Sequence, residues 1–116
     1  MTREAHTYWA NIYVGFKEGY DGKTHTMKEA KSIAQKYCNE IGYCVTVTPT
    51  DFVYKDGTEK GCIVGLINYP RFSESIHSLL EHAKELGDIY MREFSQNRIT
   101  ILSPALTLML EKDESE

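Results

Sequence analysis

Two helical stripes of apolar residues constrain the fold of this chain more than any other feature of its sequence. In both stripes the apolar residues recur every three or four positions, which predicts a helix with one buried face. The first stripe comprises Met27, Ala30, Ile33, Ala34, Tyr37, Cys38 and Ile41. The second comprises Ile76, Leu79, Leu80, Ala83, Leu86, Tyr90 and Phe94. Each helix therefore needs another layer of structure to cover its apolar face.

Strand patterns flank the two helices and supply that layer. Short alternating or β-branched runs occur at residues 9–17, 43–48, 52–54, 62–69 and 99–102. The resulting order, βαββαβ, predicts a ferredoxin-like α+β fold. Right-handed crossovers then place both helices on one face of an antiparallel sheet. Residues 105–110 add an extra C-terminal strand, or continue the preceding strand past a kink at Ser103-Pro104.

Capping and turn residues mark where these elements begin and end. Thr26 opens a capping box at the first helix, and Gly42 occupies the position after its last turn. Residues 56–57, an Asp-Gly pair between apolar segments, predict a β-hairpin. Either Ser73 or Ser75 caps the second helix.

The strand at residues 62–69 is apolar on both faces. Cys62, Val64 and Leu66 form one face, and Ile63 and Ile67 lie on the other. Because the two helices cover only one face of the sheet, the second face needs a partner. The sequence therefore predicts a homo-oligomer, either a dimer or a multiple of dimers.

Composition indicates an ordinary globular chain. Its 116 residues fit a single domain, with residues 1–8 and 111–116 expected to fray at the ends. Hydrophobic residues make up 41% and charged residues 26%, which excludes a disordered chain. The net charge of −4 and the dispersed basic residues argue against binding to DNA. With no membrane-length apolar run and no signal peptide, we expect a cytoplasmic protein.

The residues that usually carry catalysis form no recognisable arrangement. Three cysteines without CxxC spacing fit reduced, buried thiols. His77 and His82 lie about 140° apart around one helix and so cannot share a metal ion. The nucleophile, phosphate-loop and dinucleotide motifs are missing. We therefore predict a protein that is not an enzyme and that uses neither a cofactor nor a metal.

Polar and aromatic residues at strand ends indicate a nucleotide-like ligand instead. Arginine suits a phosphate near a helix N-terminus, and an aromatic ring can stack on a base. The predicted ligand-binding residues are Asn68, Tyr69, Arg71, Phe72, Asn97, Arg98, Tyr20 and Lys23. The competing interpretation is that Phe72 packs in a turn while Arg71 and Arg98 pair with acidic side chains.

Three phrases of the sequence resemble a known family. The segments IYVGFKEGYDGK, GYCVTVTPTDFVY and CIVGLINYPRF are similar to those of the first described family of phage Thoeris anti-defence proteins, over residues 11–110. The resemblance implies a non-enzymatic sponge for a cyclic ADP-ribose isomer made by bacterial TIR-domain proteins. It also implies an oligomer, with further pockets for cyclic oligonucleotides.

Two other classes of function remain open. One is a small dimeric ferredoxin-like enzyme that uses the open sheet face as its active site. The other is a protein–protein interaction module whose apolar face binds a target protein.

Overall fold

The chain forms two helices, five strands and one 3-10 turn in a computed structural model that describes residues 1–19 and 22–113. In chain order the elements are β1 (Trp9–Gly15), α1 (Met27–Ile41), β2 (Thr46–Tyr54), β3 (Gly57–Ile67), the 3-10 turn (Pro70–Phe72), α2 (Ile76–Glu93), β4 (Arg98–Leu102) and β5 (Thr107–Glu111).

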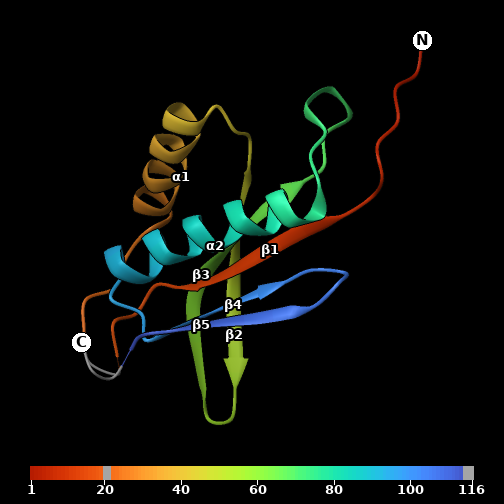
Figure 1. Cartoon of the computed structure of the whole chain (residues 1–116). Coiled ribbons are helices and arrows are strands. Elements are labelled where there is room, and N and C mark those ends of the chain that lie inside the picture. Colours follow the sequence, from red (N-terminus) through yellow and green to blue (C-terminus); the bar gives the residue numbers. More distant parts are fainter. Residues whose placement is uncertain (20–21, 114–116) are drawn as a thin grey trace.

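All five strands join one antiparallel sheet in the order β2-β3-β1-β4-β5 (Figure 1). The first four strands have the arrangement of a ferredoxin-like fold, which confirms the predicted α+β class. The C-terminal segment pairs antiparallel with β4 and is a separate strand. The break at Ser103-Pro104 therefore reverses the chain, and the previous strand does not continue past it.

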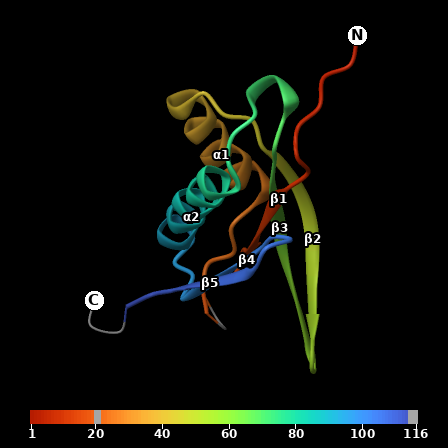
Figure 2. The ribbon, with the colours of Figure 1, turned by 45° about the vertical axis from the view of Figure 1, so that its right-hand side comes forward.

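Both helices lie on one face of the sheet (Figure 2). The strand residues that point toward the helices, such as Ala10, Ile12 and Val14 in β1, are fully buried. Gly87 of α2 packs closely against the sheet: a Cβ there would lie 2.9 Å from Leu110 Cδ1. Most of the two apolar stripes therefore packs into the core as predicted, whereas Ile41, at the end of α1, is 47% exposed.

Local signals correctly placed both ends of α1, the start of α2 and the turn between β2 and β3. The Thr26 hydroxyl accepts a hydrogen bond from the backbone N–H of Glu29, and Gly42 ends α1 in a left-handed conformation. Ser75, rather than Ser73, caps α2. Asp56 adopts a positive φ of 60° in the β2–β3 hairpin.

Several strand boundaries differ from the sequence prediction, and the largest difference is at β3, which begins at Gly57 rather than Cys62. The second strand begins at Thr46, because the N–H of Tyr43 still bonds to the last turn of α1 through the Cys38 carbonyl. The third strand ends at Ile67, opposite Trp9, where its neighbour β1 begins. Pro49 does not interrupt β2, since β2 is an edge strand and a proline is tolerated there.

The second face of the sheet carries apolar side chains that no helix covers. Tyr13 and Ile63 are paired across β1 and β3, and so are Trp9 and Ile67. Phe52 of β2 makes an edge-to-face contact with Tyr13 at 6.4 Å between ring centroids.

Within the described residues, neither helix has the length and apolar character needed to cross a membrane.

Replacing Thr26 by alanine should remove the cap of α1. The Thr26 hydroxyl accepts the Glu29 N–H at 3.2 Å, so we expect a loss of about 1 kcal/mol in the free energy of unfolding. Urea denaturation of Thr26→Ala and of Thr26→Ser, which keeps the oxygen, measures this difference. Equal stabilities for both variants would show that the cap contributes nothing.

Candidate functional site

A small cavity lies where the α1–β2 connection meets the segment that follows β3. Its volume is about 220 Å³, below the ~300 Å³ at which ligand sites usually begin, so it can hold only part of a ligand. The lining is mostly aromatic and apolar, with one carboxylate: Gly42, Tyr43, Cys44, Ile67, Tyr69, Phe72 and Glu74.

Asn68 fixes the chain segment that forms one wall of this cavity. Its side-chain amide donates to the His6 carbonyl at 2.9 Å, and its side-chain oxygen accepts the Glu74 N–H at 2.9 Å. Its own N–H donates to the Tyr8 carbonyl at 3.2 Å. The buried amide thus ties the N-terminal segment to the start of α2 and sets the position of Glu74.

The Glu74 carboxylate is held at both oxygens. The Tyr43 hydroxyl donates to Oε2 at 2.5 Å, and the Ser78 hydroxyl donates to Oε1 at 2.8 Å. His82 Nε2 lies 3.7 Å from Oε1. In addition, the Tyr8 hydroxyl donates to the Glu74 backbone carbonyl. The side chain therefore stands in one defined position, with 17% of its surface exposed.

The tyrosines at the cavity stay protonated at neutral pH. Burial, and then the hydrogen bond to Glu74, raise the pKa of Tyr43 above its usual value. The hydrogen bond with the Cys44 thiol, and then burial, raise the pKa of Tyr69. Both hydroxyls can consequently act as hydrogen-bond donors at neutral pH.

Two of the predicted ligand-binding residues line the cavity, and two neighbours do not. Tyr69 and Phe72 contribute their rings to its wall. Asn68 is buried and its polar groups are used within the fold. The Arg71 guanidinium lies 5.2 Å from the centroid of the Phe72 ring, outside the lining.

The other predicted residues lie at the opposite end of β1. Asn97 and Arg98 open β4, which runs antiparallel to β1, whereas Asn68 follows the far end of β3. Seven residues of β1 separate the two ends, about 20 Å. Lys23 also lies at this end of β1, because its neighbour Thr24 forms an isolated β-bridge with Lys17, just after the last residue of β1. Tyr20 lies outside the described residues. One ligand therefore cannot contact both groups within a single chain.

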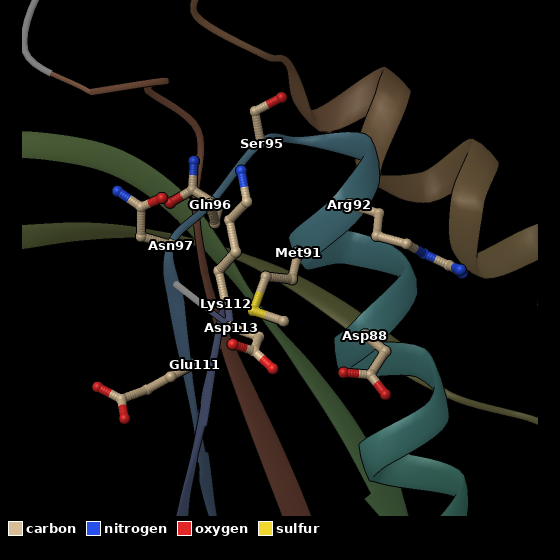
Figure 3. A pocket seen from close by; sticks show the side chains of 9 residues that line it. All are labelled: Asp88, Met91, Arg92, Ser95, Gln96, Asn97, Glu111, Lys112 and Asp113. Atoms are coloured by element: carbon tan, nitrogen blue, oxygen red, sulfur yellow. The ribbon is translucent and has the colours of Figure 1, made fainter. Parts of the chain in front are cut away.

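Asn97 lines a larger cavity of about 540 Å³ at the end of α2 (Figure 3). The charged side chains in the lining of this cavity carry both signs: Asp88, Arg92, Glu111, Lys112 and Asp113. None of its lining residues is aromatic. Arg98 is paired with Glu111 at 3.3 Å, in line with the salt-bridge interpretation of that arginine. We prefer the smaller cavity because it combines aromatic rings with a carboxylate held in place.

Two of the three cysteines are protected from reaction, whereas Cys44 is exposed and lines the cavity, and no metal site is found in the described residues. Burial raises the pKa of the Cys62 thiol to about 12, so it stays protonated and unreactive at neutral pH. Burial also raises the pKa of Cys38. Within residues 1–19 and 22–113, no group of three or more histidine, cysteine or acidic side chains is placed to hold a metal ion.

Sequence reasoning missed Glu74 and the groups that hold it. Its partners are far apart in the chain, at Tyr43, Ser78 and His82, and no motif links them. The available signal was an acidic residue directly before a helix cap and just after the aromatic segment 69–72.

Comparison with known proteins identifies the fold. No protein-family model and no curated protein matches the chain. Two solved structures match it over 100% of its length and 98% of theirs, with TM-scores of 0.83 and 0.79. Both structures are of phage SAM lyase. One is in complex with S-methyl-5'-thioadenosine and the other is in the apo state. The sequence identities, 16% and 18%, limit this likeness to the fold.

These matches overturn the family assignment made from the sequence. The chain was expected to resemble Thoeris anti-defence proteins and to sequester a cyclic ADP-ribose isomer without turnover. Its whole-chain neighbours are instead enzymes that act on SAM, so the resemblance and the sponge function were wrong.

Removing the Tyr43 hydroxyl should destabilise the fold measurably. Tyr43→Phe leaves Glu74 without one of its donors, and a hydrogen bond to a charged group contributes about 1.5–3 kcal/mol. Because the pair is partly exposed, we expect a loss near the lower end of that range in urea denaturation. Tyr54→Phe, on the exposed hairpin, is the matched control and should change nothing. Equal stability of Tyr43→Phe and wild type would contradict the bond.

Proposed function

We propose that this protein is a SAM lyase, which binds SAM (S-adenosylmethionine) at the Glu74 cavity and releases S-methyl-5'-thioadenosine. The observation that carries the proposal is a fixed carboxylate in an aromatic cavity, within a chain whose whole-length neighbours are phage SAM lyases. One of those neighbours is bound to S-methyl-5'-thioadenosine, so a nucleoside-type ligand fits this fold.

The lining of the cavity suits the chemical groups of SAM. An adenine ring can stack on the Tyr69 or Phe72 side chain. A carboxylate such as Glu74 can pair with the sulfonium cation or accept hydrogen bonds from ribose hydroxyls. SAM carries no phosphate, so the phosphate contact expected of Arg71 has no counterpart in this ligand. Since the cavity holds only about 220 Å³, part of the ligand lies beyond its mouth.

Cleavage of SAM between sulfur and Cγ without water has two balanced routes. In the first, the substrate carboxylate attacks its own Cγ and the S–C electron pair passes to sulfur. The products are S-methyl-5'-thioadenosine and protonated homoserine lactone. In the second, a base removes a proton from Cβ, a Cβ=Cγ double bond forms and the sulfur leaves. The products are S-methyl-5'-thioadenosine, vinylglycine and a proton.

The contacts of Glu74 favour the first route. Each of its oxygens already accepts a hydrogen bond, from Tyr43 or from Ser78, so fewer of its lone pairs are free to take a proton from the substrate. The lactone route needs no protein base. It requires only that the substrate be held in a folded conformation with its carboxylate near Cγ. We therefore assign Glu74 to binding and orientation.

Incubation of the purified protein with SAM tests the proposed activity. Chromatography with mass spectrometry should detect S-methyl-5'-thioadenosine and homoserine lactone from the wild type. Glu74→Gln should lower kcat/KM about 10- to 100-fold, since a charged hydrogen bond to the substrate is lost. Glu81→Gln, an exposed acid of α2 that is paired with Lys84, is the matched control and should keep full activity.

The products decide between the alternatives. Vinylglycine would assign the elimination route, and homoserine would indicate hydrolysis rather than lyase chemistry. If the wild type yields no S-methyl-5'-thioadenosine and shows no heat of binding with it in calorimetry, the proposed function is wrong.

We also propose that the protein is a homo-oligomer, because the open sheet face carries uncovered apolar side chains. Trp9, Tyr13, Ile63 and Ile67 all point to this face. Sedimentation at micromolar concentration should give a mass above that of one chain, and Ile63→Lys should shift it toward the monomer. Lys60→Glu, a charge change on the exposed hairpin, is the control. A monomeric wild type would contradict the proposal.

A further inference from the structure

A second layer of polar contacts lies behind Glu74, between α1 and α2. The Tyr37 hydroxyl of α1 lies 2.8 Å from His82 Nδ1 and donates to Glu85 Oε2 at 3.0 Å. On its other side the His82 ring presents Nε2 to Glu74 Oε1 at 3.7 Å. Glu85, Tyr37, His82 and Glu74 thus form a continuous chain that ends at the candidate site.

The donors in this chain can be assigned from the chemistry of its members. A carboxylate only accepts, so the single hydroxyl proton of Tyr37 is used toward Glu85. The Tyr37 oxygen must then accept from His82, which requires a proton on Nδ1. If Nε2 were unprotonated, its lone pair would face the Glu74 carboxylate. A proton on Nε2 as well turns this repulsion into an ion pair.

We propose that Tyr37 and Glu85 hold His82 with Nδ1 protonated, so that the ring places a second, cationic N–H against Glu74 and fixes the orientation of that carboxylate. His82 and Tyr37 are in this view positioning residues, which act on the substrate through Glu74. The expected effects on turnover rest on the proposed SAM lyase function, whereas the expected protonation of His82 does not.

The groups packed around the ring support this assignment. From α1 the ring meets Tyr37, and from the α1–β2 connection it meets Tyr43, at 4.5 Å between centroids. Glu74 faces it from the segment before α2. Burial, and then the bond to Glu85, raise the pKa of Tyr37, so this hydroxyl remains a donor at neutral pH. The ring is therefore packed against acceptors and tyrosines.

The tautomer of His82 tests the proposal without any need for activity. Long-range proton–nitrogen NMR of the wild type should show Nδ1 protonated. In Glu85→Gln the amide can donate to the Tyr37 oxygen, the hydroxyl turns to donate to His82, and Nδ1 should lose its proton. Glu81→Gln, an acid of the same helix paired with Lys84, is the control and should match the wild type. An unprotonated Nδ1 in the wild type, or one tautomer in all three proteins, would overturn the proposal.

The pH dependence of turnover provides the second test. The wild-type kcat/KM should fall as the pH is raised through the titration of His82 seen in the same spectra, because Glu74 then loses its cationic partner. Tyr37→Phe and His82→Gln should each lower kcat/KM about 10-fold, and His82→Gln should also remove this pH dependence. A purely structural role would lower stability while leaving the pH profile unchanged. If the wild type shows the expected tautomer but no turnover of SAM, the proposed function fails while the assignment of the network stands.

Discussion

The hydrogen bond from the Tyr90 hydroxyl to the Ala30 carbonyl joins the two helices at the centre of the core, and the candidate site depends on the alignment it sets. The bond is 2.6 Å long, and both residues are fully buried. Two turns further along α1 and two turns back along α2, Tyr37 meets His82. The Tyr90–Ala30 bond thus fixes how the two antiparallel helices are aligned, and this alignment also brings Tyr37 and His82 together about 10 Å further along.

The two ends of the helix pair use their histidines in different ways. His25 is buried, with its ring nitrogens 2.5 Å from a Glu18 oxygen and 2.7 Å from a Glu29 oxygen, and its ring is stacked on Phe94. It fastens the segment after β1 to the start of α1. His82 is only half-buried and stands beside a carboxylate that reaches a cavity. One histidine therefore joins two segments of the fold, and the other, in our proposal, orients a carboxylate at the candidate site.

A shared fold does not by itself assign a function, because one scaffold supports many activities. What adds weight here is that the Glu74 carboxylate is fixed by several independent contacts beside aromatic rings. Fixing a carboxylate restricts its freedom, and such restriction is expected where a ligand must meet it in one orientation. The larger cavity at the end of α2 has charged groups of both signs but no aromatic ring in its lining.

The sequence by itself determined the class of fold, the ends of the first helix, the start of the second and one hairpin turn. Those features rest on local rules: the apolar period of a helix, the Thr26 cap, the left-handed Gly42 and the hairpin at residues 56–57. It also placed Tyr69 and Phe72 correctly at a strand end, where they reach a cavity.

Only the tertiary structure decided which polar groups meet. Glu74 gains its environment from Tyr43 and His82, which stand 31 positions before it and 8 after it. In the sequence Tyr37 is one more apolar position of a helix, and nothing there indicates that its hydroxyl contacts a second helix. Periodicity reports which face of an element is buried, but hydrogen bonds between elements depend on their register and on their distance, and local propensity encodes neither. For the same reason two predicted groups at strand ends, near Asn68 and near Asn97, looked alike in the sequence although β1 holds them at opposite ends of the sheet.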